Sequence, residues 1–116
     1  MVKYKVPATS ANLGPGFDVL GLAVDLYNTV ELEEIERGLE IFVSGINSDV
    51  IPKDKSNLAY TIISDFFDRV GYEAKGLRIN ISNCIPVARG LGSSASIVVG
   101  SLLCANDISK IGRAHV

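Results

Sequence analysis

The segment from Pro86 to Ser96 contains two glycines followed by a pair of adjacent serines, and it lies between an alternating apolar run and a run of helix-forming residues. Such a loop can fold closely around an anion and offer it unpaired backbone N–H groups at a helix N-terminus. Gly90 and Gly92 allow the backbone to approach the anion closely. Ser93 or Ser94 can cap the helix, or turn a hydroxyl toward a phosphate or its metal. The chemistry that this segment predicts is phosphate binding, as for ATP.

Taken alone, the same pattern is also typical of a loop that only connects two elements and caps a helix. It is not a Walker A loop, because no Gly-Lys-Ser/Thr follows at the required spacing. Gly90-x-Gly92-x-x-Ala95 matches the short form of the dinucleotide-binding fingerprint. A dinucleotide-binding domain therefore stays an alternative at this point.

A second motif, Pro7-Ala-Thr-Ser-Ala-Asn-Leu-Gly-Pro-Gly-Phe-Asp18, lies near the N-terminus. Together the two segments resemble motifs one and two of the GHMP kinases, the superfamily that includes galactokinase, homoserine kinase and mevalonate kinase. The resemblance extends from about Val2 to Asp107 and includes the order and separation of both motifs. The residues of the first motif agree best with those of the homoserine kinases. Another small-molecule kinase, of the mevalonate type, is the nearest alternative.

The resemblance implies transfer of the γ-phosphoryl group of ATP to the side-chain hydroxyl of L-homoserine, giving O-phospho-L-homoserine in threonine biosynthesis. It implies ATP and Mg²⁺ as cofactors, with Ser94 as a candidate Mg²⁺ ligand. The residues that it assigns to the ATP phosphates are Pro86, Val87, Ala88, Arg89, Gly90, Leu91, Gly92, Ser93, Ser94, Ala95 and Ser96.

On the acceptor side, the resemblance assigns Asn12 and Asp18 to homoserine, and it assigns Asn57 to adenine. A carboxylate at position 18 can pair with the ammonium group of homoserine or accept from its hydroxyl. The alternatives are that Asn12 and Asp18 only close turns, and that Asn57 only begins a helix. No catalytic base is named, because no lysine near the first motif offers Asp18 a partner. Ser96 stands where alanine is commoner in the family, and we expect little effect from the difference.

Composition limits the remaining possibilities. The chain has 116 residues, of which 47% are hydrophobic, and a net charge of −2. This length suits one domain, and this charge gives no basic footprint for nucleic acid or an anionic membrane. Cys84 and Cys104 lack the spacing of metal ligands, so we expect two buried free thiols. With no signal-peptide or membrane-spanning pattern, a cytoplasmic protein is predicted. A homodimer of the complete enzyme stays open.

The hydrophobic periodicity predicts an α+β fold, with helices packed on a mostly antiparallel or mixed sheet. We expect Leu26–Ile35 to turn at Arg37-Gly38 into a hairpin partner, and Leu102 and Leu103 to face inward together with Ile97 and Val98. The predicted elements are strands at Val2–Val6, Leu26–Ile35, Leu39–Val43 and Leu77–Ser82, a helix from an N-cap at Ser56 to Gly71, and a helix at Ser94–Asn106. The resemblance implies the GHMP-kinase N-terminal domain, whose core is similar to the second domain of ribosomal protein S5.

The family pattern is expected to cover residues 1–110 as an incomplete ATP-binding domain. The last six residues, Ile111–Val116, would be encoded by ATC GGA AGA GCA CAC GTC, which matches a widely used sequencing-adapter sequence. We therefore expect 111–116 to be a non-native tail, with a natural divergent end as the alternative. Because the third family motif and the downstream acidic Mg²⁺ ligand are not in the sequence, negligible kinase activity is expected from these 116 residues alone.

Overall fold

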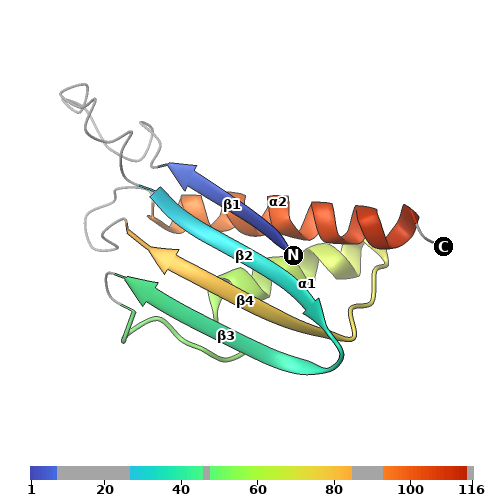
Figure 1. Ribbon diagram of the computed structural model, residues 1–116, viewed down its shortest axis with the longest axis horizontal. Coiled ribbons are helices and arrows are strands. Elements are labelled where there is room, and N and C mark those ends of the chain that lie inside the picture. The colour runs from blue at the N-terminus through green and yellow to red at the C-terminus, as the bar shows by residue number, and fades with distance from the viewer. Residues whose placement is uncertain (8–26, 46–47, 85–92, 115–116) are drawn as a thin grey trace.

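A mixed four-stranded sheet carries two helices on one of its faces (Figure 1). The computed structural model describes residues 1–7, 27–45, 48–84 and 93–114. The predicted α+β fold class is confirmed. The elements are β1 (Val2–Pro7), β2 (Tyr27–Ile35), β3 (Gly38–Gly45), α1 (Leu58–Val70), β4 (Gly76–Asn83) and α2 (Ser93–Ala114).

The strand order is β1-β2-β4-β3, so β2 and β3 are not neighbours. The predicted hairpin between them is wrong. β4 lies between the two strands, antiparallel to β2 and parallel to β3. Leu77, Ile79 and Ile81 are at most 7% exposed, which explains why β4 takes a central place. The short connection from β2 to β3 crosses the start of β4 at Gly76, where a Cβ atom would lie 2.5 Å from the carbonyl carbon of Arg37.

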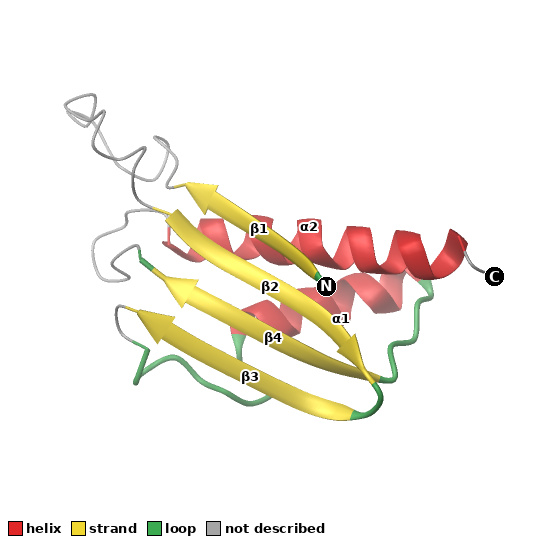
Figure 2. Cartoon of the chain, viewed as in Figure 1, coloured by secondary structure: helices red, strands yellow, loops and turns green. Residues whose placement is uncertain are grey.

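The same topology excludes the alternative of a dinucleotide-binding domain. That fold needs a mostly parallel sheet with helices on both faces. Here β1 pairs with β2, and β2 with β4, in antiparallel register. In the described part of the chain, both helices cover the same face (Figure 2).

Helix α2 lies close to the sheet through small residues rather than large ones. A Cβ atom on Gly100 would lie only 2.9 Å from Cγ2 of Val30 on β2. Ile97 is buried as predicted and Val98 is half-buried. Leu102 and Leu103, however, are 40% and 38% exposed, so their predicted inward orientation is wrong. Among residues 95–110 of α2, those that are buried are Ser96, Ile97, Gly100, Ser101, Cys104, Ala105 and Ser109.

Both ends of α1 are defined by local hydrogen bonds. Its N-cap is Asn57 and not Ser56, whose exposed hydroxyl instead donates to Asp54. At the other end Gly71 adopts a left-handed conformation, as the sequence predicted. The N–H groups of Gly71 and Tyr72 donate to the carbonyls of Asp68 and Phe67, which is the Schellman pattern. The rings of Phe67 and Tyr72 pack edge to face at 5.0 Å, as this motif favours.

Helix α2 is longer than the sequence predicted, because it continues past Asn106 to Ala114. It therefore extends into the segment 111–116 that we expect to be a non-native tail. Whether a domain ends at residue 110 stays a prediction. Neither helix in the described ranges is long and apolar enough to cross a bilayer.

Candidate functional site

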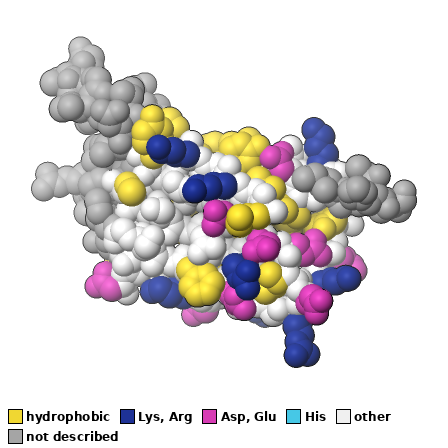
Figure 3. All heavy atoms as spheres, in the orientation of Figure 1, with side chains coloured by type: hydrophobic (Ala, Val, Ile, Leu, Met, Phe, Trp, Pro, Cys, Tyr) yellow, Lys and Arg dark blue, Asp and Glu magenta, His cyan; other side chains and the backbone are white. Residues whose placement is uncertain are grey.

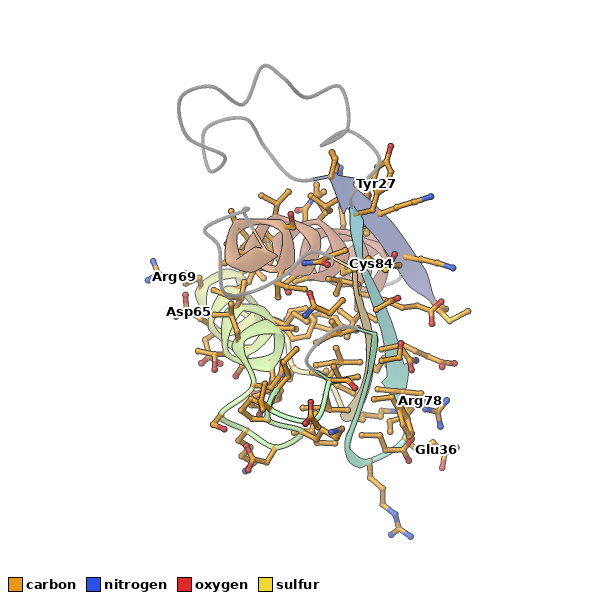
Figure 4. The ribbon with its side chains drawn as sticks, turned by 90° about the vertical axis from the view of Figure 1, so that its left-hand side faces the viewer. Tyr27, Glu36, Asp65, Arg69, Arg78 and Cys84 are labelled. Atoms are coloured by element: carbon orange, nitrogen blue, oxygen red, sulfur yellow. The ribbon has the colours of Figure 1, made fainter. Side chains whose placement is uncertain are left out.

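The two sequence motifs begin and end at the same end of the sheet. Pro7 at the end of β1 pairs with Tyr27 at the start of β2, and Asn28 beside it pairs with Asn83 at the end of β4. Figure 4 faces this end of the molecule and labels Tyr27 and Cys84. Both helices also begin at this end (Figure 1). The topology thus brings together the flanks of segments that are far apart in the sequence.

Most of the predicted site residues fall outside the described ranges. Asn12 and Asp18 lie in 8–26, and Pro86, Val87, Ala88, Arg89, Gly90, Leu91 and Gly92 lie in 85–92. Apart from Asn57, the described members of the set are in the first turn of α2, where Ala95 is half-buried and Ser96 is buried. The roles assigned to all of these residues stay predictions.

The N-terminus of α2 has the electrostatic character that an anion site needs. The helix is 22 residues long and carries no acidic residue in its first turn. Its first N–H groups have no partner within the helix, and its dipole places partial positive charge at the same point. Phosphate groups therefore fit this end of α2, with no carboxylate of the first turn to oppose them.

Side-chain hydrogen bonds hold α2 against the edge strand β1. The hydroxyl of Ser96 donates to the carbonyl oxygen of Pro7 at 3.1 Å. Further along, the hydroxyl of Tyr4 donates to the carboxylate of Asp107. That hydrogen bond raises the pKa of Tyr4 above its usual value. The first of these contacts places the start of α2 beside the end of β1.

A buried asparagine that the sequence analysis did not single out holds the end of β4. Asn28 is fully buried, and its Oδ1 atom accepts from the backbone N–H of Cys84 at 2.8 Å. Its position offered a signal, because Asn28 precedes Val30 and Leu32 in the inward-facing alternation of β2. A polar residue in such a series is buried at a cost unless it is hydrogen-bonded.

The structure gives Asn57 a clear local role. The side chain is 1% exposed, and Oδ1 accepts from the N–H of Tyr60 at 3.3 Å while Nδ2 donates to the carbonyl of Pro52 at 2.7 Å. Asn57 therefore caps the start of α1, whether or not it has a further role. Its contact with adenine stays a prediction.

Only one of the two cysteines is buried as the sequence predicted. Cys104 is buried as expected, whereas Cys84 is exposed at the end of β4. Burial raises the pKa of the Cys104 thiol to about 12, and the thiol donates to the carbonyl of Val30 at 3.4 Å. Cys104 is thus a protonated part of the core.

The face of the sheet away from the helices has a different character. Figure 3 shows acidic and basic side chains interspersed there. Arg78 forms ion pairs with Glu33 at 3.0 Å and with Glu40 at 2.8 Å. A shallow pocket of about 220 Å³ on this face is lined by residues of all four strands, and it contains none of the predicted site residues. Within the described ranges, no group of three or more acidic, histidine or cysteine side chains could hold a metal.

Comparison with known proteins assigns the family. Residues 57–114, which are half of the chain, match the model of the GHMP kinases N terminal domain. This chain belongs to the GHMP kinases. The match begins at the N-cap of α1 and includes the predicted phosphate segment and α2.

Among curated GHMP kinases, the chain is 53% identical to the homoserine kinase of Caldanaerobacter subterraneus. The alignment has 109 residues and covers 94% of this chain. The chain is 52% identical over 108 residues to the homoserine kinase of Petrotoga mobilis, covering 93%. The chain spans about 35% of the length of these relatives.

Solved GHMP kinase structures agree with the fold. The homoserine kinase of Cytophaga hutchinsonii superimposes with a TM-score of 0.71 at 26% identity, over 92% of this chain and 35% of that one. The mevalonate kinase of Methanococcus jannaschii superimposes with a TM-score of 0.67 at 25% identity, over 92% of this chain and 40% of that one. The fold is therefore shared by GHMP kinases whose names specify different acceptors.

Proposed function

We propose that this chain is the N-terminal part of a homoserine kinase and supplies its nucleotide-binding segment. The observation that carries the proposal is the identity of about half of the aligned residues to curated homoserine kinases over nearly the whole chain. The reaction joins the hydroxyl oxygen of L-homoserine to the γ-phosphorus of ATP. It breaks the bond from that phosphorus to the bridging oxygen of ADP, which leaves, and the hydroxyl releases its proton.

Phosphoryl transfer needs aligned reactants and neutralised charge more than it needs covalent help. We assign Pro86–Ser96 to the phosphates, because the segment ends in the first turn of α2, where N–H groups and the helix dipole favour an anion. The absence of acidic residues from that turn supports the assignment.

Mg²⁺ would accompany ATP and neutralise its phosphate charge when bound. We propose Ser94 as the ligand that this chain supplies. A single hydroxyl is a weak site, so further oxygen ligands from ATP, water and other residues are required.

On the acceptor side we propose Asn12 and Asp18 as the residues that orient homoserine. β1 and β2 flank the segment that contains both, and these strands end and begin beside the N-terminus of α2. The proposal adds a small-molecule substrate and a cytoplasmic site of action, and it requires neither nucleic acid nor a membrane.

The experiment that tests this function is an acceptor panel on the full-length enzyme that contains this chain. ADP release is measured with ATP, Mg²⁺ and either L-homoserine or mevalonate. We expect turnover that depends on homoserine. Phosphorylation of mevalonate but not homoserine would overturn the proposal in favour of the alternative that the mevalonate kinase fold keeps open.

A further inference from the structure

Two buried polar side chains reach across the fold at the end of the sheet where the motifs begin and end. The Asn28–Cys84 hydrogen bond joins residues 56 apart in the sequence, and the Ser96–Pro7 bond joins residues 89 apart. Both bonds end on backbone atoms.

Asn28 holds the backbone just beyond the last residue of β4. The β2–β4 pairing ends at the Asn28–Asn83 pair, so Cys84 lies outside the strand. The side chain of Asn28 bonds the Cys84 N–H at 2.8 Å and so fixes one backbone group past the strand end. Leucine or valine would continue the apolar series of β2 at this position, but neither could accept that hydrogen bond.

Ser96 fixes the other flank of the same segment. Its hydroxyl is fully buried in the first turn of α2 and bonds the last carbonyl of β1. Alanine, which is commoner here in the family, would fill nearly the same space but could not form this bond, so we no longer expect the difference to have little effect. Cys84 is the last described residue before 85–92 and α2 is the first element after it, so the two contacts fix both flanks of that segment.

We propose that Asn28 and Ser96 are positioning residues for the nucleotide: through Cys84 and α2 they set the separation and direction of the two flanks of the phosphate segment. This inference rests on the proposed function. Fixed flanks leave a ligand-binding segment less conformational freedom to lose on binding, so the ligand binds more tightly.

The chain offers a matched control on α2. Ser101, like Ser96, is fully buried, but its hydroxyl has no hydrogen-bond partner in the described part of the chain. Ser101→Ala therefore deletes the same atom from the same helix without breaking a bond. Asn28→Leu and Ser96→Ala delete the two contacts from different elements, so one remains informative if the other fails to fold.

The test measures ATP binding to the full-length enzyme by titration calorimetry, together with KM for each substrate and the thermal midpoint. We expect Asn28→Leu and Ser96→Ala to raise the Kd and KM for ATP about 3- to 10-fold, as the loss of one hydrogen bond predicts. The KM for homoserine should change less than twofold in Asn28→Leu, and Ser101→Ala should bind ATP like the parent.

The outcomes separate this inference from the proposed function. A lowered thermal midpoint with unchanged ATP affinity in both variants would show that the contacts are only structural, and would overturn the inference. Weaker ATP binding in an enzyme that phosphorylates another acceptor would support the inference and overturn the assignment to homoserine. A parent enzyme that binds no ATP would overturn both.

Discussion

At the scale of single residues, this fold uses buried polar side chains to hold backbone groups at the ends of its strands and helices. Asn28 accepts from Cys84, Asn57 bonds the backbone on both sides, and Ser96 donates to Pro7. Each lies where an apolar residue could pack. Because a buried donor or acceptor without a partner is costly, each of these contacts specifies one arrangement of the chain.

The acceptor side of the proposed reaction gives a prediction for Asp18. Asp18→Asn keeps the size of the side chain but removes the charge that would pair with the ammonium group of homoserine. We expect the KM for homoserine to rise about tenfold or more, as loss of a charged hydrogen bond implies. The KM for ATP should stay nearly constant in steady-state assays. If neither value changes, Asp18 only closes its turn.

The two thiols should differ in reactivity. Cys84 is exposed, whereas Cys104 is buried and its pKa is raised to about 12, so Cys104 carries almost no thiolate at neutral pH. In native protein we expect an aromatic disulfide reagent to modify Cys84 quickly and Cys104 only after unfolding. The Cys84→Ser variant should lose the fast phase. Equal rates for both thiols in native protein would contradict the buried position of Cys104.

At the scale of elements, the start of α1 is a direct test of the cap. Asn57→Ala removes the bond to the Tyr60 N–H and leaves the Pro52 carbonyl without its partner. We expect the free energy of unfolding to fall by about 2 kcal/mol. Ser56→Ala is the control at the neighbouring exposed position, where a change within about 0.5 kcal/mol is expected. If urea denaturation showed a larger loss of stability in Ser56→Ala than in Asn57→Ala, Ser56 would be the N-cap.

Two glycines with positive φ should respond very differently to alanine. Gly71 ends α1 at a φ of 73° with nothing within 4 Å of an added Cβ, so Gly71→Ala should cost about 1 kcal/mol. Gly45 ends β3 at a φ of 93°, and a Cβ there would lie 2.3 Å from the carbonyl oxygen of Asn83. We expect Gly45→Ala to cost about 3 kcal/mol or more. Denaturation midpoints that are equal for both variants would show that β3 can move away from β4.

The elements also show which part of the fold could be predicted from sequence. The strands at 2–6 and 77–82, and the helix ending at Gly71, follow alternation, four-residue periodicity and a glycine stop, which are local signals. The hairpin prediction is wrong because strand pairing is not local. β4 begins 38 residues after the start of β3 in the sequence, yet it lies between β2 and β3 in the sheet. The predicted inward face of α2 is wrong for a related reason. α2 lies so close to Val30 of β2 that small residues are required on the side that faces the sheet.

At the scale of the whole molecule, stability should fall at high pH. The Cys104 thiol has its pKa raised from 9.0 to about 12, so the unfolded chain loses this proton first. Between those values the folded state binds more protons, and the free energy of unfolding falls as pH rises. Below about pH 9 the contribution is fully present. Tyr72, whose hydrogen bond to Glu34 raises its pKa from 10.0 to about 12, acts in the same direction.

The measurement is urea denaturation from about pH 8 to about pH 11. Cys104→Ala lacks the titrating thiol, so its stability should fall less steeply than that of the parent over this range. Tyr72→Phe provides a second comparison, because it removes the other group. Identical slopes in parent and Cys104→Ala would mean that the thiol titrates alike in the folded and unfolded states.

Local sequence patterns were enough to predict the GHMP-kinase resemblance of the two motifs, the α+β class and most element positions, because each depends on neighbouring residues or on short periodic patterns. They did not determine the place of β4, the inward face of α2 or the contacts of Asn28 and Ser96. Those depend on which backbone groups and side chains meet across 56 or 89 residues of chain. Tertiary structure decided them, because the packing of helices on a sheet selects for size and for hydrogen-bond partners as well as for hydrophobicity.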